Sequence, residues 1–180
     1  MRVPARSLVL LDRDGVINRD SDQYIRSVAE WIPLPGSLEA IARLSAAGFV
    51  IAVVTNQSGV GRGYFSEATL AAIHQAMRAQ VAAAGGRIDA VYYCPHRPDE
   101  GCACRKPEPV LIQRAVREFI ARSDRTCYVG DKLSDIEAAK AAGVRPILVG
   151  ALAADADALE VEGFADLPTA ADALLAEIGA

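Results

Sequence analysis

Short apolar runs alternate along the chain with longer segments in which apolar residues recur every three or four positions. The short runs have the length of strands, and because they are apolar throughout, we expect both faces of each strand to be buried. The predicted strands are 7–12, 49–56, 88–94, 126–131 and 146–150, and the predicted helices are 37–48, 66–85, 109–123 and 134–143. This order predicts an α/β fold, a three-layer sandwich with a mostly parallel sheet between two layers of helices.

The residues at the predicted helix ends agree with this assignment. Serine favours the N-cap and glycine the left-handed stop of a helix, which predicts caps at Ser37, Ser66 and Ser134 and stops at Gly48, Gly85 and Gly143. The segment 151–163 has no clear period, and it receives no assignment.

Length and charge limit the functions that the chain can have. At 180 residues it is long enough for one α/β core, so we predict a single domain over residues 1–180. A net charge of −4 without a lysine or arginine cluster argues against nucleic-acid binding. With no apolar run of membrane-spanning length and no extended interface pattern, we expect no membrane contact, a cytoplasmic location and a monomer.

Polar residues gather where the predicted strands end, which is the edge at which ligands bind in open α/β sheets. Asp12 and Asp14 follow the first strand, and two carboxylates so close repel unless a proton or a cation separates them. Oxygen ligands of this kind suit Mg²⁺. The tetrapeptide DRDG alone is equally typical of a turn.

A second acidic pair, Asp131 and Asp135, follows the fourth predicted strand beside Lys132. Asp135 in the first turn of a helix capped by Ser134 would account for this segment structurally. Two acidic strand ends at one edge favour a functional site.

Three cysteines and a histidine lie close together in the chain. Cys94, His96, Cys102 and Cys104 supply three thiolates and one imidazole, the ligand set of a closed tetrahedral Zn²⁺ site, although their spacing is tighter than in common zinc fingers. Unliganded thiols are the alternative. Cys127 is interpreted as a core residue and His74 as an ordinary helix residue.

Four segments, LLDRDGVIN, VVTNQSG, CRKP and VGDKLSDIEAA, occur in that order between residues 10 and 139. They resemble the four motifs of the haloacid dehalogenase (HAD) superfamily of phosphatases. The resemblance implies a Rossmann-type sheet, here without a large cap domain. The segments TNQSGVGRG and YYCPHRPDEGCACRKP are similar to those of the subgroup that contains sugar-bisphosphate and histidinol-phosphate phosphatases, in which the cysteine loop binds structural zinc.

The resemblance also implies roles for individual residues. Asp12 is expected to attack phosphorus and Asp14 to act as general acid and base. Mg²⁺ would be held by Asp12, the Asp14 backbone carbonyl and Asp131, while Thr55 and Lys106 would stabilise the transferring phosphoryl group. Substrate contacts are expected from Asn56, Gln57, Ser58, Arg62, Arg105 and Lys132.

Several of these residues have structural interpretations as well. Thr55 and Asn56 are typical of a turn, and Arg105 and Lys106 of a solvated pair before a helix that begins at Pro107. Residues 59–63, GVGRG, lack the spacing of a nucleotide-binding loop and are equally typical of a flexible one.

The choice of substrate depends on the positive charges near the site. A sugar bisphosphate would use several cations, so we prefer it to histidinol phosphate. A zinc-stabilised binding module without catalysis is the third hypothesis. Residues 19–24, the loop after the first strand, and the role of Asp135 are left open.

Overall fold

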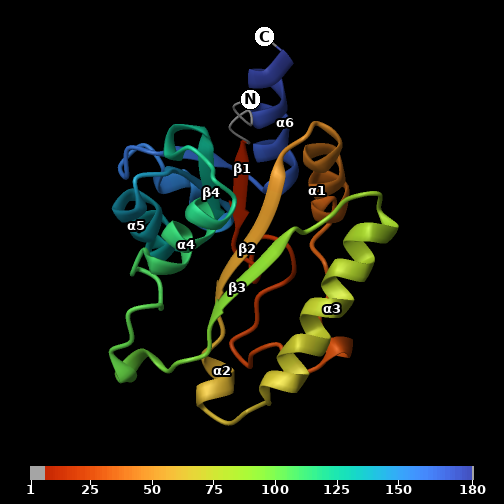
Figure 1. Ribbon diagram of the computed structural model, residues 1–180, viewed down its shortest axis with the longest axis vertical. Coiled ribbons are helices and arrows are strands. Elements are labelled where there is room, and N and C mark those ends of the chain that lie inside the picture. Colours follow the sequence, from red (N-terminus) through yellow and green to blue (C-terminus); the bar gives the residue numbers. More distant parts are fainter. Residues whose placement is uncertain (1–6, 180) are drawn as a thin grey trace.

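Six parallel strands form one sheet in the order β3-β2-β1-β4-β5-β6 in the computed structural model, which describes residues 7–179 (Figure 1). The strands are β1 (Leu8–Leu11), β2 (Val50–Asn56), β3 (Ala90–Cys94), β4 (Thr126–Gly130), β5 (Arg145–Val149) and β6 (Glu162–Phe164). Because β1 is central, paired with β2 on one side and β4 on the other, its four side chains are fully buried. The predicted α/β fold with a mostly parallel sheet is confirmed.

Helices cover both faces of this sheet. One face carries α1 (Ser37–Ala46), α3 (Glu67–Ala83) and α6 (Leu167–Gly179), and the other carries α4 (Val110–Glu118) and α5 (Leu133–Ala142). The first three helices pack on a core that includes Ile41, Ile73 and Leu174, and the other two on a core that includes Ile112 and Ala139. The short helix α2 (Ser58–Gly61) lies at the carboxyl ends of the strands (Figure 1).

The structure corrects the prediction at several element ends. α4 stops five residues before its predicted end, because Ile120 takes a left-handed conformation with φ of 51° and Ala121 donates a hydrogen bond back to Val116. No glycine marks this stop. Pro107 does not begin a helix, since α4 starts at Val110.

Two of the three predicted serine caps are wrong. Ser66 caps α3 by accepting a hydrogen bond from the Thr69 N–H at 3.0 Å. Ser37 lies inside α1 and donates to the Val16 carbonyl, while Ser134 lies inside α5, whose N-cap is Lys132. The stops at Gly48, Gly85 and Gly143 have positive φ as predicted.

The last strand and the last helix have no counterpart among the elements predicted from the sequence. β6 is a three-residue edge strand with two exposed residues, so it has no apolar run, and α6 buries two leucines and two alanines. Arg145 of β5 joins both elements by ion pairs of 2.6 Å to Glu162 and 2.7 Å to Glu177. Polar contacts thus add to the apolar packing of this part of the fold.

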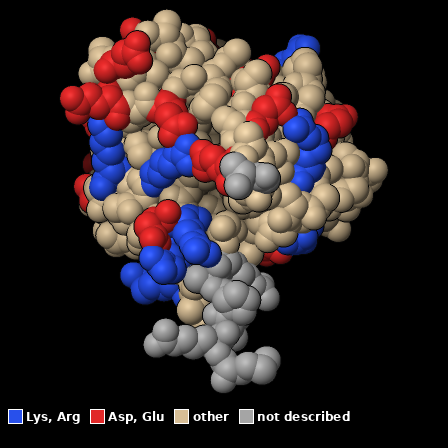
Figure 2. All heavy atoms as spheres, turned by 90° about the horizontal axis from the view of Figure 1, so that it is seen from above, with Lys and Arg blue, Asp and Glu red and all other residues tan. Residues whose placement is uncertain are grey.

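Acidic and basic side chains lie side by side at the amino ends of the strands (Figure 2). Among the residues drawn in colour, this end of the molecule has no large patch that is only acidic or only basic. None of the helices within residues 7–179 is long and apolar enough to span a membrane.

Replacing the serine that caps α3 tests the difference between the predicted and observed caps. We expect Ser66→Ala to lower the free energy of unfolding by about 1 kcal/mol, because the Thr69 N–H loses its acceptor. Ser134→Ala, a matched control without a cap hydrogen bond, should stay within about 0.5 kcal/mol of the parent in urea titrations. A larger loss for Ser134→Ala than for Ser66→Ala would contradict the observed helix starts.

Candidate active site

The carboxyl ends of the strands surround a cavity of about 300 Å³. The four residues predicted to be catalytic, Asp12, Asp14, Thr55 and Lys106, all line it. They come from three segments far apart in the sequence: the end of β1, the end of β2 and the loop before α4. The predicted convergence of strand ends at one edge is confirmed.

Lys106 is a buried cation, only 3% exposed, and its ammonium group lies between two carboxylates. Nζ is 3.1 Å from Asp12 Oδ1 and 2.7 Å from Asp135 Oδ1. It also contacts the Tyr128 hydroxyl at 2.6 Å and the Val54 carbonyl at 3.1 Å. Burial alone would lower the pKa of Lys106, but the two aspartates hold it above its usual value, so the group stays charged.

Asp12 and Asp131 form the acidic part of the site. Burial and the neighbouring carboxylates raise the pKa of Asp12 to about 6, against the opposing effect of Lys106, and raise that of Asp131 to about 7. Asp131 Oδ1 is buried and has no hydrogen-bond partner among residues 7–179. One oxygen each from Asp12, Asp131 and Asp135 lies within 4.8 Å of the others.

Asp135 is bound differently from the other two acids. Its Oδ2 accepts hydrogen bonds from the backbone N–H groups of Asp131 and Lys132, both at 3.1 Å, and its Oδ1 contacts Lys106. Both oxygens are therefore engaged by the protein. This arrangement favours a supporting role for Asp135, which fixes the start of α5 and the position of Lys106.

Gly15 is required by the close approach of Asp131 to the turn after β1. It has φ of +85°, and a Cβ atom built there would lie 2.1 Å from Asp131 Oδ2. The glycine of DRDG therefore serves both the turn and the acidic site.

Several predicted substrate contacts are held by the protein itself. The Asn56 side chain pairs with the Lys106 backbone, accepting from its N–H and donating to its carbonyl, both at 3.1 Å. Gln57 donates to Asp14 Oδ2 at 2.7 Å and to Thr55 Oγ1 at 3.1 Å. Asn56, Gln57 and Ser58 line the cavity, but the two amides act first on their neighbours.

The predicted cationic contacts divide into two groups. Arg105 and Lys132 line the cavity, whereas Arg62 is exposed at the end of α2 and does not line it. Lys132 Nζ pairs with Asp20 Oδ2 at 2.8 Å, and although burial works in the opposite direction, this contact lowers the pKa of Asp20.

Four residues that shape the site were not predicted from the sequence: Tyr128, Tyr24, Arg13 and His74. Tyr128 supports Lys106 from inside β4. Tyr24 of the loop after β1 lines the cavity and packs against Tyr64, with the rings tilted and their centroids 5.1 Å apart. Arg13 is fully buried and binds Asp14, Gln57 and His74 of α3, so His74 is not an ordinary helix residue. A buried arginine gives no periodicity signal; its place between two aspartates was the only clue.

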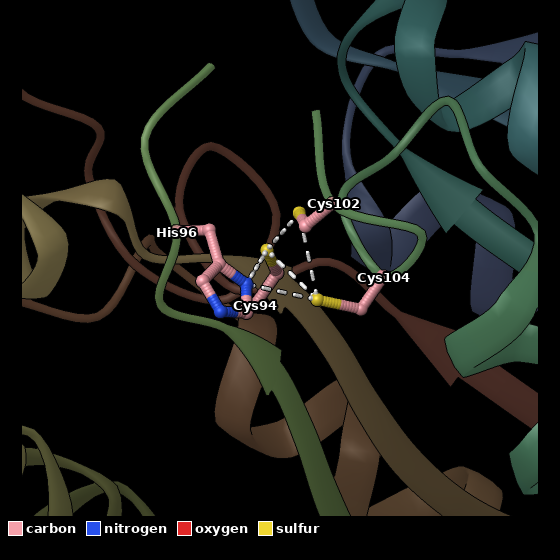
Figure 3. A group of neighbouring side chains, drawn as sticks. All are labelled: Cys94, His96, Cys102 and Cys104. Carbon is pink, nitrogen blue, oxygen red and sulfur yellow. Dashed lines mark hydrogen bonds between the residues drawn. The ribbon is translucent and has the colours of Figure 1, made fainter. Parts of the chain in front are cut away.

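Cys94 at the end of β3 and His96, Cys102 and Cys104 of the loop that follows come together as a compact cluster (Figure 3). Cys104 Sγ is 3.2 Å from Cys94 Sγ, 3.7 Å from Cys102 Sγ and 3.2 Å from His96 Nδ1. These distances are too long for disulfides and close to the ligand separation of about 3.8 Å in a tetrahedral zinc site. The four residues therefore fit a Zn²⁺ ion.

The cluster is connected to the cavity by the chain that follows it. Arg105 comes directly after Cys104 and its Nη1 reaches the His96 carbonyl at 3.5 Å, and Lys106 is the next residue. Fixing the cluster thus fixes the two cations of this loop.

Known proteins resemble the chain over most of its length. It is 52% identical over 142 residues to the D-glycero-β-D-manno-heptose-1,7-bisphosphate 7-phosphatase of Pseudomonas putida, a match that covers 79% of the chain and 81% of the relative. The chain belongs to the heptose-1,7-bisphosphate 7-phosphatase family.

Solved structures of heptose-1,7-bisphosphate phosphatases have the same fold. The structure of the Bordetella bronchiseptica enzyme, complexed with magnesium and phosphate, has a TM-score of 0.88 at 44% identity and covers 95% of this chain and 99% of its own. That of the Burkholderia thailandensis enzyme has a TM-score of 0.72 at 40% identity, covering 94% and 99%. A HAD-hydrolase-like family model matches residues 103–173, and with these relatives it confirms the resemblance to HAD phosphatases.

Removing the imidazole of His74 tests whether this family member buries it in the neutral form. Burial and the Arg13 charge lower the pKa of His74 to about 3. Between pH 7 and pH 5, His74 therefore becomes protonated in the unfolded chain but stays neutral in the folded chain. This residue should therefore make the free energy of unfolding about 2 kcal/mol smaller at pH 5 than at pH 7.

We expect His74→Gln to lose that part of the pH dependence in urea titrations at both pH values. The glutamine keeps a hydrogen-bond acceptor for Arg13 but does not titrate. Identical pH dependence in the parent and the variant would show that His74 titrates normally in the folded state.

Proposed function

We propose that the chain is a Mg²⁺-dependent phosphatase that removes the 7-phosphate of D-glycero-D-manno-heptose 1,7-bisphosphate through an aspartyl-phosphate intermediate. The observation that carries the proposal is the convergence of Asp12, Asp14 and Lys106 in one cavity of a chain 52% identical to an enzyme of this name. We place the reaction in the synthesis of nucleotide-activated heptose, a precursor of the lipopolysaccharide core.

The acidic part of the site fits a divalent cation. Asp131 Oδ1 is buried without a partner among residues 7–179, and burial, together with the neighbouring carboxylates, raises the pKa values of Asp12 and Asp131. A bound cation would offset both effects. Mg²⁺ would be held by Asp12, Asp131 and the Asp14 backbone carbonyl, and when bound it would neutralise charge on the transferring phosphoryl group. The relative with a TM-score of 0.88 is described as complexed with magnesium and phosphate.

Asp12 is the proposed nucleophile. Its Oδ1 accepts hydrogen bonds from the Arg13 N–H at 2.8 Å and from Lys106, which orients the carboxylate. A carboxylate oxygen attacks phosphorus, the bond from phosphorus to the sugar oxygen breaks, and Asp14 gives that oxygen its proton. Asp14 then takes a proton from the water that attacks the aspartyl-phosphate, and inorganic phosphate leaves as Asp12 is regenerated.

Lys106 and Thr55 are the proposed electrostatic groups. The ammonium of Lys106 is held beside Asp12 before substrate arrives, so no reorganisation is needed as negative charge develops on the phosphoryl oxygens. Thr55 is 1% exposed, and because its hydroxyl oxygen accepts from Gln57, its hydroxyl hydrogen would be donated to a phosphoryl oxygen.

The substrate is proposed from the cations at the mouth of the cavity. Arg105, Lys132 and Ser58 line it and would meet the second phosphate or the sugar hydroxyls. We propose the β anomer, since the relative at 52% identity is named for it. Arg62 lies outside this cavity, so we no longer assign it a substrate contact.

We propose that Cys94, His96, Cys102 and Cys104 bind a structural Zn²⁺. Three thiolates and one imidazole leave no open position for chemistry, so the ion would hold the loop that carries Arg105 and Lys106. The short distances within the cluster support this.

The first experiment measures phosphate release from both anomers of heptose 1,7-bisphosphate and from histidinol phosphate, with Mg²⁺ and with a chelator. We expect fast, Mg²⁺-dependent hydrolysis of the β bisphosphate and at least about 100-fold lower kcat/KM for histidinol phosphate. Asp12→Asn should lose at least about 1,000-fold in kcat with an unchanged thermal melt, because the amide cannot attack phosphorus.

Each other outcome has a definite meaning. Preference for histidinol phosphate would replace the substrate and keep the mechanism, and retained turnover by Asp12→Asn would eliminate the aspartyl-phosphate route. Inactivity on all three substrates would contradict the proposed function.

Replacing one cluster ligand tests the structural role of zinc. We expect Cys102→Ser to lower the zinc content below one ion per chain, to lower Tm and to reduce activity, because the loop before Lys106 loses its anchor. Cys127→Ser is the matched control, because this thiol lies in β4, outside the cluster. The zinc content of the Cys127→Ser variant should equal that of the parent. A full zinc content in Cys102→Ser would refute the assignment.

A further inference from the structure

Arg13 is the least exposed charged residue of the site. Its side chain is 0% exposed although both neighbours, Asp12 and Asp14, line the cavity. β1 ends at Leu11 and Arg13 lies in a bend, where its side chain reaches His74 of α3 while those of Asp12 and Asp14 line the cavity. Arg13 therefore cannot touch a substrate and can act only through its neighbours.

The Arg13 guanidinium group binds Asp14 through two parallel hydrogen bonds, a planar fork, and its other contacts, with Gln57 and His74, hold this fork in place. Nε donates to Asp14 Oδ1 and Nη2 to Asp14 Oδ2, both at 3.0 Å. Nη2 also donates to Gln57 Oε1 at 3.0 Å, and Nη1 lies 3.3 Å from His74 Nε2. Because a guanidinium group has only donors, His74 Nε2 must accept, and the imidazole hydrogen is on Nδ1.

Gln57 connects Arg13 to Asp14 through its side-chain amide. With Oε1 fixed by Arg13, its Nε2 is directed at Asp14 Oδ2, 2.7 Å away. Asn18 completes the set by donating to Asp14 Oδ1 at 2.8 Å. The Asp14 carboxyl is thus gripped on both oxygens while it still lines the cavity.

We propose that Arg13 is a positioning residue for proton transfer by Asp14, acting directly through its two hydrogen bonds and indirectly through Gln57. The proposal rests on the proposed function, in which Asp14 gives a proton to the leaving sugar oxygen and later takes one from water. A carboxyl group that can rotate spends little time within reach of that oxygen, and the planar fork of arginine prevents the rotation. Lysine supplies the charge without the fork.

The hydrogen bond from Arg13 to Asp12 comes from the backbone, and Arg13→Lys keeps the positive charge of the side chain. The Arg13 N–H donates to Asp12 Oδ1 at 2.8 Å, a contact that any residue except proline supplies. Substitution of the side chain therefore separates positioning of the proton donor from positioning of the nucleophile.

The test compares two leaving groups in the Mg²⁺-loaded enzyme. Loss of a sugar alkoxide needs a proton from Asp14, whereas p-nitrophenolate leaves without one, and kcat/KM reports on this first phosphoryl transfer. We expect Arg13→Lys to lower kcat/KM about 30-fold for heptose 1,7-bisphosphate and less than about threefold for p-nitrophenyl phosphate. Equal losses on both substrates would overturn the proposal, since a general structural defect affects them alike.

Two further variants keep the proposal testable if Arg13→Lys folds poorly. His74→Leu removes the acceptor that secures the fork, and His74→Gln retains one, so His74→Leu should show the larger loss with the sugar substrate. Equal losses for these two variants would contradict the role of the fork. Arg117→Lys, an exposed arginine of α4, is the matched control and should match the parent on both substrates.

A double substitution locates the effect at Asp14. In an Asp14→Asn background Arg13→Lys should change kcat/KM for the sugar substrate by less than about twofold, because the group that Arg13 positions no longer transfers protons. A further 30-fold loss would show that Arg13 acts elsewhere. Inactivity of the parent enzyme on heptose 1,7-bisphosphate would instead reject the proposed function, a result distinct from either failure.

Discussion

The site depends on one buried charge, the ammonium group of Lys106. A cation removed from water is tolerated only if it is paired and hydrogen-bonded, and four separate elements supply the partners. Asp12 comes from the end of β1, the Val54 carbonyl from β2, the Tyr128 hydroxyl from β4 and Asp135 from α5. The parallel register brings them together, because Leu11 lies opposite both Val53 and Val129.

The same burial explains why the acids around Lys106 require a further cation. Three carboxylates lie together, but Lys106 pairs with two of them, Asp12 and Asp135, and Asp135 uses both of its oxygens on Lys106 and the start of α5. Burial, and after it the neighbouring carboxylates, raises the pKa values of Asp12 and Asp131. A site that needs Mg²⁺ for charge balance is also one that releases it when these acids are protonated, so cation binding and proton binding are in competition.

The sequence predicted what depends on local pattern and missed what depends on tertiary contacts. The five apolar strands, the acids at their ends and the cluster of Cys94, His96, Cys102 and Cys104 each leave a signal in the chain, and the structure brings their residues together. The stop of α4 at Ile120, the pairing of Asn56 with the Lys106 backbone and the burial of Arg13 leave none. An amide or a guanidinium group can bond to substrate or to protein, and only the three-dimensional arrangement decides which.

Two loops shape the cavity within residues 7–179, where a larger inserted domain would do so in other phosphatases of the resembled superfamily. The loop after β1 is held by the ion pair of Asp20 with Lys132 and by the packing of Tyr24 against Tyr64. The Cζ atom of Arg26 lies 4.9 Å from the centroid of the Tyr64 ring. The cysteine loop is fixed by its own cluster and by Arg105. Because both loops carry residues that line the cavity, the sequences of these two short segments contribute to the choice of substrate.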